Sequence, residues 1–203
     1  MKTIAILSQK GGAGKSTLAR ALAVAALEDG RPAAIIDADP QGTVLAWAGR
    51  RDAKAPAVAG LDGLPLERTA ARWEEAGAEV LLLDTPPHAT ALIGIAAKLA
   101  DVILIPVRPS PDDLAGIGPT VEIARQVGKP FGIVFNAAPP RGAALMLARA
   151  ALTTFGHVCP TAVVERLGHQ YASAEGLTIL EREPRSPGAE EVRAVWRWVL
   201  SLI

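Results

Sequence analysis

The sequence predicts a doubly wound α/β fold, in which helices flank a mostly parallel sheet. Five short apolar runs recur along the chain, and each is nearly continuous, as expected of strands buried on both faces of a parallel sheet. Segments in which apolar residues have helical spacing separate these runs. Polar residues follow each run, where the carboxyl ends of parallel strands gather ligand-binding groups at one edge.

The expected strands and helices alternate along the first two thirds of the chain. The strands are Ile4–Leu7, Ala33–Ile36, Val80–Leu83, Val102–Ile105 and Phe131–Phe135. The helices between them are Ser16–Asp29, Thr43–Arg51, Glu67–Ala76, Ala89–Leu99 and Leu114–Val127. The segment Ala53–Pro65 is rich in Ala, Gly and Pro, so we expect a surface connection with one short edge strand there.

The last third of the chain has weaker patterns. We expect a helix over Arg141–Phe155, a further strand within Val158–Val164 and a terminal helix over Glu190–Ile203. The terminal helix has an apolar stripe, which suits either packing onto the domain or contact with a membrane surface. Its polar face mixes Glu190 with Arg193 and lacks the basic excess that anionic lipids attract, so we expect it to pack onto the domain.

Composition limits the classes of protein that this chain can belong to. Its 203 residues are 50% hydrophobic and 21% charged, which predicts one globular domain over residues 1–203. The net charge is zero, so DNA binding would need a local basic patch. No apolar run approaches the roughly 20 residues of a membrane-spanning helix, and no leader precedes the first strand, so we expect a cytoplasmic protein without stable membrane insertion. The single Cys159 permits no internal disulfide and is expected to be a small buried side chain.

The first strand leads into a glycine-rich loop, Gln9-Lys10-Gly11-Gly12-Ala13-Gly14-Lys15-Ser16-Thr17, and then into a helix. Glycines let backbone N–H groups converge on a phosphate, and the start of the helix adds unpaired donors and a positive dipole. Lys15 would reach the terminal phosphates, and the Ser16 hydroxyl would bind Mg²⁺. A glycine turn with two incidental lysines is the alternative, but the flanking strand and helix favour a phosphate loop.

Carboxylates follow two other strands. Asp84 ends its strand before Thr85-Pro86-Pro87, which is a Walker B arrangement beside a magnesium ion; an ordinary turn aspartate is the alternative. Asp37 and Asp39 are two residues apart and face the same way in an extended chain, so both can approach the magnesium and γ-phosphate region. Capping of the helix over Thr43–Arg51 by Asp39 and Gln41 is compatible with that role.

The pattern K-G-G-x-G-K-[ST] of the loop resembles the deviant Walker A motif of the ParA/MinD family of P-loop ATPases, which have a SIMIBI-type fold. The runs D-x-D-P-Q at Asp37–Gln41 and P-V-x-P-S-P-x-D at Pro106–Asp113 strengthen the resemblance. It implies a slow, partner-stimulated, Mg²⁺-dependent ATPase. Asp39 would position the attacking water, and Asp37 would support the water shell of the metal. Lys10 would cross an ATP-bound homodimer to the partner's phosphates, although an isolated loop lysine could equally be solvated.

The resemblance also assigns Asn136, at the end of its strand, to hydrogen bonding with adenine. Its amide has both a donor and an acceptor for a purine edge, but a turn asparagine is the alternative. The arginine that usually follows in the family is absent, since Ala137-Ala138-Pro139-Pro140 stands there.

Within the family, Gln9 and the segment Thr161–Arg166 with Tyr171 resemble the small plasmid-partition ParA proteins of the ParF kind. The resemblance implies a protein that binds DNA non-specifically on the nucleoid and segregates plasmid or chromosome cargo with a ParB-type or small centromere-binding partner. The start of the chain at its first strand leads us to expect no N-terminal DNA-binding extension. A surface for DNA could come from the late arginines, although many of these could instead pair with acids. The candidates are Arg141, Arg149, Arg166, Arg182 and Arg185.

Three other branches share this fold. Nitrogenase iron protein and the cluster-carrier ATPases need paired cysteines, which this chain lacks. Ligases of the dethiobiotin synthetase type generally lack the counterpart of Lys10. A MinD-like ATPase that works at a membrane surface remains the alternative to the partition protein, because the terminal helix is amphipathic.

Overall fold

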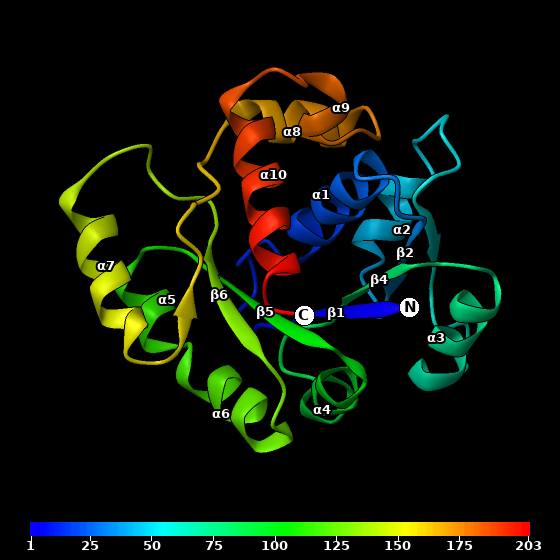
Figure 1. The fold of residues 1–203 in the computed structure, drawn as a ribbon, viewed down its shortest axis with the longest axis horizontal. Helices are drawn as coiled ribbons and strands as arrows, with labels where there is room; N and C mark the ends of the chain where they lie inside the picture. The colour runs from blue at the N-terminus through cyan, green and yellow to red at the C-terminus, as the bar shows by residue number, and fades with distance from the viewer.

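The computed structural model describes residues 1–203 and contains one sheet of seven parallel strands. Their order is β3-β2-β4-β1-β5-β6-β7, and Figure 1 shows the central strands crossing the middle of the molecule. The strands are β1 Lys2–Ile6, β2 Ala33–Asp37, β3 Ala57–Ala59, β4 Val80–Asp84, β5 Val102–Val107, β6 Phe131–Phe135 and β7 His157–Val158. The predicted doubly wound α/β fold is confirmed, and its sheet is entirely parallel.

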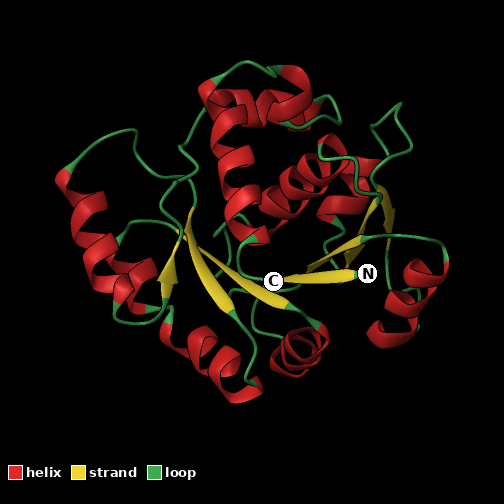
Figure 2. Ribbon diagram, in the orientation of Figure 1, coloured by secondary structure: helices red, strands yellow, loops and turns green.

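Helices cover both faces of this sheet (Figure 2). They are α1 Lys15–Glu28, α2 Thr43–Ala48, α3 Leu66–Glu75, α4 Thr90–Leu99, α5 Pro111–Ala115, α6 Gly118–Val127, α7 Ala143–Thr153, α8 Leu167–Ala174, α9 Ile179–Arg182 and α10 Pro187–Leu200. Because successive strand residues point to opposite faces, β1 divides its side chains between two cores. Ile4 and Ile6 pack with α1, α2, α9 and α10, whereas Ala5 packs with α3, α4, α6 and α7.

All five predicted strands are present, and the expected edge strand is β3. The prediction of one helix over Leu114–Val127 is wrong, because the chain breaks between α5 and α6. A Cβ at Gly116 would lie 2.7 Å from Cε of Lys10, so glycine at the break gives room to a side chain from the distant glycine-rich loop. Pro119 then stands in the first turn of α6, where the missing N–H costs no helical hydrogen bond.

Two other predicted boundaries also change. The helix expected to continue to Arg51 ends at Ala48, with Gly49 as its C-cap. The strand expected within Val158–Val164 is only a two-residue β7, although the N–H groups of Cys159 and Val163 still donate to carbonyls of β6. Pro160 lies between these contacts and has no N–H to continue the ladder.

The last third also contains helices α8 and α9, which the apolar pattern did not predict. Helix α10 begins at Pro187, before the predicted start, and the side chain of Ser186 caps it by accepting a hydrogen bond from the N–H of Ala189. Its apolar stripe faces inward, as expected. Val195 and Trp196 belong to the core that α1 lines, and Cys159 is buried in the same core. Burial raises the pKa of the Cys159 thiol to about 11.

Candidate functional site

The glycine-rich loop connects β1 to α1 at the carboxyl edge of the sheet. Gly12 and Gly14 have φ of 76° and 87°, a left-handed conformation that residues with a Cβ rarely adopt. Gly14 is the N-cap of the 14-residue helix α1, and no side chain caps this end. The first N–H groups of α1 therefore remain available to an anion, and the helix dipole adds to that attraction.

Lys15 and Asp84 lie together beneath the loop. The Nζ atom of Lys15 donates to the carbonyl oxygen of Lys10 at 3.3 Å, so the ammonium is turned back under the glycines. Burial lowers the pKa of Lys15, and the neighbouring carboxylates of Asp84 and Asp39 partly oppose that change. Asp84 is fully buried, and burial raises the pKa of its carboxyl to about 7. The nearby Ser16 hydroxyl lowers this pKa, yet neither oxygen of Asp84 completes a hydrogen bond.

The two unpartnered oxygens of Asp84 fit a cation at this position, because a buried carboxylate without partners is costly. Nowhere in the chain do three acidic, histidine or cysteine side chains cluster to hold a metal by themselves. Mg²⁺ commonly binds in this way, through one or two protein oxygens, water and the phosphates of a nucleotide. Ser16 and Asp84 are the residues that would hold it.

The structure corrects the expected helix cap after β2. Asp37, rather than Asp39 or Gln41, binds the start of α2, because its Oδ2 accepts hydrogen bonds from the N–H groups of Val44 and Leu45 at 2.8 and 3.0 Å. Asp39 instead accepts from the N–H of Gln41 at 2.9 Å and remains half-exposed near Lys15. The roles predicted for Asp37 in the metal's water shell and for Asp39 beside the attacking water stay predictions.

Lys10 lies on the outer side of the loop. Its Nζ donates to the carbonyl oxygen of Asp112 and lies 3.8 Å from Oδ1 of Asp113, both in α5. The side chain is 36% exposed, and its stem packs on Gly116. Lys10 is therefore neither freely solvated nor directed into its own phosphate loop, and α5 supplies its partners.

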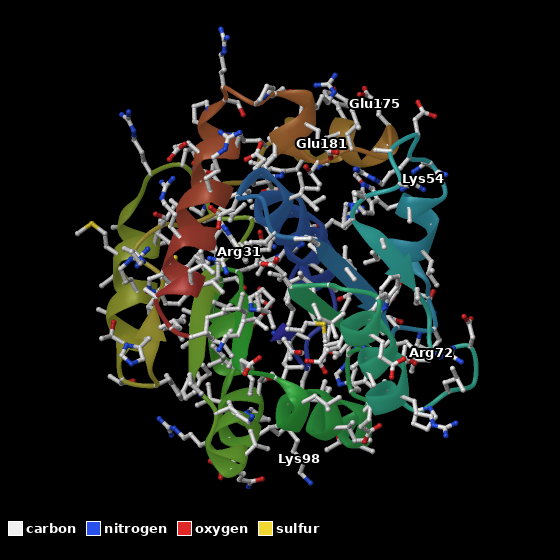
Figure 3. All side chains as sticks on the ribbon, turned by 45° about the vertical axis from the view of Figure 1, so that its right-hand side comes forward. Arg31, Lys54, Arg72, Lys98, Glu175 and Glu181 are labelled. Carbon is white, nitrogen blue, oxygen red and sulfur yellow. The ribbon has the colours of Figure 1, made fainter.

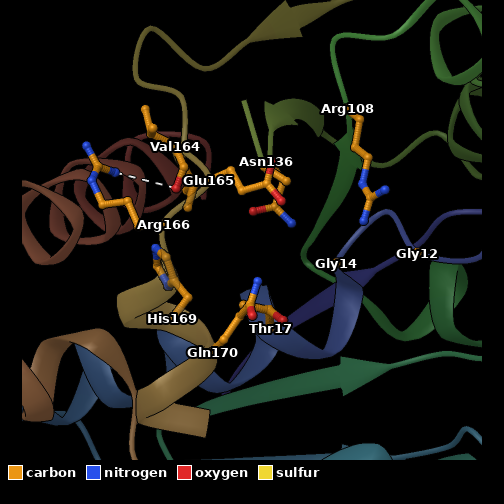
Figure 4. Close-up of a pocket in the computed structure, with 12 residues that line it drawn as sticks. Gly12, Gly14, Thr17, Arg108, Asn136, Val164, Glu165, Arg166, His169 and Gln170 are labelled. Atoms are coloured by element: carbon orange, nitrogen blue, oxygen red, sulfur yellow. Dashed lines mark hydrogen bonds between the residues drawn. The ribbon is translucent and has the colours of Figure 1, made fainter. Parts of the chain in front are cut away.

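A cavity of about 160 Å³ opens beside the loop (Figure 4). Its lining comes from the loop, the ends of β5 and β6, the segment before α8, and α8 itself. These residues are Gly12, Gly14, Thr17, Arg108, Asn136, Ala137, Val163, Val164, Glu165, Arg166, His169 and Gln170. One edge of the cavity is thus formed by the glycine-rich loop, and α8 with the segment before it forms the opposite side.

Asn136 lies where the cavity meets the loop. It is 6% exposed, and its Nδ2 donates to the carbonyl oxygen of Ala13 at 2.9 Å. A Cβ at Gly14 would lie 1.8 Å from the same nitrogen, so glycine is required there for a second reason. One donor of Asn136 is therefore used by the loop, while Oδ1 remains available as an acceptor. Its predicted hydrogen bond to adenine stays a prediction.

Arg20 is a part of the site that the sequence did not reveal. Its guanidinium donates to the carbonyl oxygen of Ser16, to Oγ1 of Thr17 and to Oγ of Ser173 in α8, at 3.1, 3.2 and 2.8 Å. Burial lowers the pKa of Arg20 to about 10. Arg20 thus ties the end of the phosphate loop to the helix that forms the far wall of the cavity.

Arg108, His169 and Gln170 also line the cavity but were not among the predicted site residues. Arg108 stands inside the P-V-x-P-S-P-x-D run, so its position after a strand could have singled it out. The two residues of α8 carry no such signal, because neither a motif nor apolar spacing marks that helix.

The apolar face of α10 is covered by the domain. Val192, Val195 and Val199 are fully buried, and Trp196 is 3% exposed. On the opposite face, Arg193 pairs with Glu28 of α1 at 2.8 Å. None of the helices is both long enough and apolar enough to span a membrane.

Comparison with known proteins agrees with this geometry. The chain is 28% identical over 213 residues to the maintenance of carboxysome distribution protein A of Halothiobacillus neapolitanus, a match that covers 98% of this chain and 96% of that protein. It is 32% identical over 202 residues to the protein of the same name from Gloeobacter kilaueensis, covering 98% and 92%. It is 26% identical over 241 residues to the chromosome-partitioning ATPase Soj of Thermus thermophilus, covering 100% and 97%.

Solved structures share the fold. A Cyanothece McdA variant in complex with ATP superposes with a TM-score of 0.77 at 20% identity, covering 100% of this chain and 97% of that chain. The septum site-determining protein MinD of Pyrococcus horikoshii, in complex with Mg-ADP, superposes with a TM-score of 0.71 at 18% identity, covering 98% and 95%. Residues 4–176 match the family described as the CobQ/CobB/MinD/ParA nucleotide binding domain. The chain belongs to this family, as its phosphate loop and parallel sheet predicted.

Proposed function

We propose that this protein is a Mg²⁺-dependent ATPase of the ParA type. ATP binding makes it a sandwich dimer that adheres non-specifically to DNA on the nucleoid, and with a ParB-type or small centromere-binding partner it segregates plasmid or chromosome cargo. The main observation in support of ATPase activity is the buried, unpartnered carboxylate of Asp84, which lies beside Ser16 and Lys15 beneath the phosphate loop. The relatives that position carboxysomes or partition chromosomes support the positioning role.

Each residue of the site has a distinct task in this proposal. Phosphoryl transfer depends mainly on positioning and on neutralising charge. The N–H groups of the loop and Lys15 hold the phosphates, and Ser16 and Asp84 hold Mg²⁺. When bound, the ion neutralises charge that develops on the phosphate oxygens. Asp39, half-exposed at the edge of the site, orients the attacking water.

Lys10 gives this ATPase its dependence on a dimer. In the structure its side chain rests on α5 through a backbone carbonyl and one partly exposed carboxylate. Such contacts are weak enough for the phosphates of a partner subunit to replace them, because an exposed ion pair contributes only about 1 kcal/mol or less. The lysine can therefore turn outward without disturbing its own phosphate loop.

Lys10→Ala tests this role. We expect the variant to bind nucleotide as the unaltered protein does, but to lose ATP-dependent dimerisation and hydrolysis, because the partner's phosphates lose their added cation. Fluorescent-nucleotide titration, light scattering after size exclusion and phosphate release measure the three properties. Lys98→Ala, at an exposed position on α4, is the matched control. Unchanged turnover in Lys10→Ala would exclude the bridging role.

The alternative, a MinD-like ATPase at a membrane surface, depended on the amphipathic terminal helix. That helix now has its apolar face buried against α1, which leaves no apolar stripe for lipid and favours DNA as the surface. Co-sedimentation with DNA and with anionic liposomes, each with and without ATP, separates the two. We expect ATP-dependent binding to DNA that weakens steeply with salt. Binding to liposomes alone would support the membrane function.

A further inference from the structure

Arg108 follows β5 directly and lies beside the phosphate loop. Its Nη2 is 3.7 Å from the position that a Cβ at Gly12 would take, so the guanidinium lies against the backbone of the loop. Figure 4 shows the side chain extending from the strand end toward the glycines. Arg108 is exposed and lines the same cavity as Gly14 and Asn136.

This guanidinium has no partner within the chain. The side chain of Arg108 takes part in none of the hydrogen bonds or ion pairs of the structure. Glu165 lines the same cavity, yet the two side chains form no ion pair. By contrast, Lys10 of the same loop rests on α5, and Lys15 donates to a loop carbonyl. Of these three cations at the loop, Arg108 is thus the one whose side chain remains free to bind an anion.

Positive groups gather at this loop, and the nearby carboxylates of Asp84 and Asp39 act on Lys15, whereas Arg108 has no ion pair. The start of α1, Lys15 and Arg108 all approach one loop, and like charges at short range repel one another. A bound polyphosphate removes this repulsion. Arginine suits the task because its planar fork can bind two phosphate oxygens at once, and charge-assisted hydrogen bonds of this kind are the stronger ones.

We propose that Arg108 binds the phosphate chain of the nucleotide held in its own subunit, as a substrate-binding residue in addition to Lys15. This role rests on the proposed function, since it needs a nucleotide in the loop. It differs from the role of Lys10, because a contact within one subunit acts on the monomer and does not require a dimer.

ADP binding by the monomer tests the proposal. We expect Arg108→Ala to weaken the affinity for Mg-ADP and Mg-ATP by about tenfold or more, as for the loss of a charge-assisted hydrogen bond. Arg108→Lys keeps the charge but not the fork and should recover only part of the affinity. The thermal midpoint of the nucleotide-free protein should not fall, because the side chain of Arg108 makes no internal bond, while the rise that ADP produces should shrink.

Arg68→Ala is the matched control, since Arg68 is exposed on α3 and also forms no ion pair. Unaltered ADP affinity in Arg108→Ala, with binding intact in the parent protein, would overturn the proposal and leave the proposed function standing. A loss confined to ATP-dependent dimerisation would overturn it too, because the contact would then lie across subunits. Failure of the parent protein to bind either nucleotide would instead refute the proposed function itself.

Discussion

Asp84 is the residue whose environment most clearly requires a ligand. It is fully buried, neither carboxylate oxygen has a hydrogen-bonding partner, and burial raises its pKa to about 7. Lys15 is close enough to lower that pKa but is itself turned toward the carbonyl oxygen of Lys10. The nucleotide-free protein thus keeps a costly group in its core, and a cation between Asp84 and the phosphates would relieve that cost.

Asp84→Asn tests this account. At pH 8 we expect the free energy of unfolding of the nucleotide-free variant to rise by about 1 kcal/mol or more, because no charge remains to be buried. Mg²⁺-dependent ATP hydrolysis should fall at least about tenfold, because the amide is a poor ligand for the ion. Urea unfolding and phosphate release measure both effects. Asp52→Asn, at an exposed position, should change neither. A less stable Asp84→Asn protein would contradict the idea that a buried, unpartnered carboxylate destabilises the core.

At the scale of elements, arginines form hydrogen bonds and ion pairs that connect the last third of the chain to the nucleotide-binding half. Arg51 follows α2, its side chain is 2% exposed, and it pairs with Glu181 of α9 at 2.7 Å. It also lies 4.5 Å from the ring centre of the fully buried Trp47, whose Nε1 donates to the carbonyl oxygen of Leu177. Glu181 in turn caps α9 by accepting from the N–H of Thr178. The carboxylate of Glu181 therefore both caps the start of α9 and pairs with Arg51 from a distant part of the chain.

Glu181→Ala should lower the free energy of unfolding at pH 7 by about 3 kcal/mol, because it leaves the buried charge of Arg51 uncompensated. Burial alone would raise the pKa of Glu181, but hydrogen bonds from Arg51 and Thr178 lower it below its ordinary 4.5. The pair therefore stabilises the protein above that pH and is lost as the pH falls below it. In urea titrations, the difference in the free energy of unfolding between the variant and the parent should shrink as the pH falls below 4.5.

Glu175→Ala provides the matched comparison for Glu181→Ala. Glu175 pairs with Arg182 on the surface, where an ion pair has little effect on stability, so we expect a much smaller loss than in Glu181→Ala. Figure 3 shows Glu175 at the rim of the molecule and Glu181 closer to its body. Equal losses of unfolding free energy in the two variants would show that the buried ion pair at Arg51 stabilises the protein no more than a surface pair does.

Over the whole molecule, charges of both signs are spread around the surface. Lys54 in the connection before β3, Arg72 on α3 and Lys98 on α4 project from separate parts of the molecule in Figure 3. Of the five arginines expected to bind DNA, three have internal partners. Arg166 pairs with Glu191, Arg182 with Glu175 and Glu183, and Arg149 donates to the carbonyl oxygen of Cys159. The expectation that many of these charges pair is confirmed.

Arg141 and Arg185 are exposed and form no ion pair, so any DNA surface made by the late arginines depends on them. We expect the double replacement Arg141→Ala with Arg185→Ala to weaken ATP-dependent DNA binding. The plot of log affinity against log salt concentration should also become less steep, by the equivalent of up to about two phosphate contacts per subunit. Titration of fluorescent DNA at several salt concentrations measures both, with Arg72→Ala as the control. An unchanged slope would place the DNA surface elsewhere.

The amino-acid sequence by itself determined the strands, the phosphate loop and the position of Asp84, because each depends on neighbours a few residues away. A buried parallel strand is apolar throughout, and the loop must follow such a strand. Lys15 and Asp84 then meet because β1 and β4 are adjacent, with Ile6 in register with Asp84.

Only the tertiary structure decided which residues surround Lys15 and Asp84. Asn136 binds the loop across 123 residues of sequence, and Arg20 binds Ser173 across 153. Lys10 packs on Gly116 at the break between α5 and α6, and α8 forms part of the cavity wall although no apolar pattern marks it. Local propensity and spacing cannot encode contacts between such distant segments, since they arise only when the packed sheet brings the carboxyl ends of its strands together.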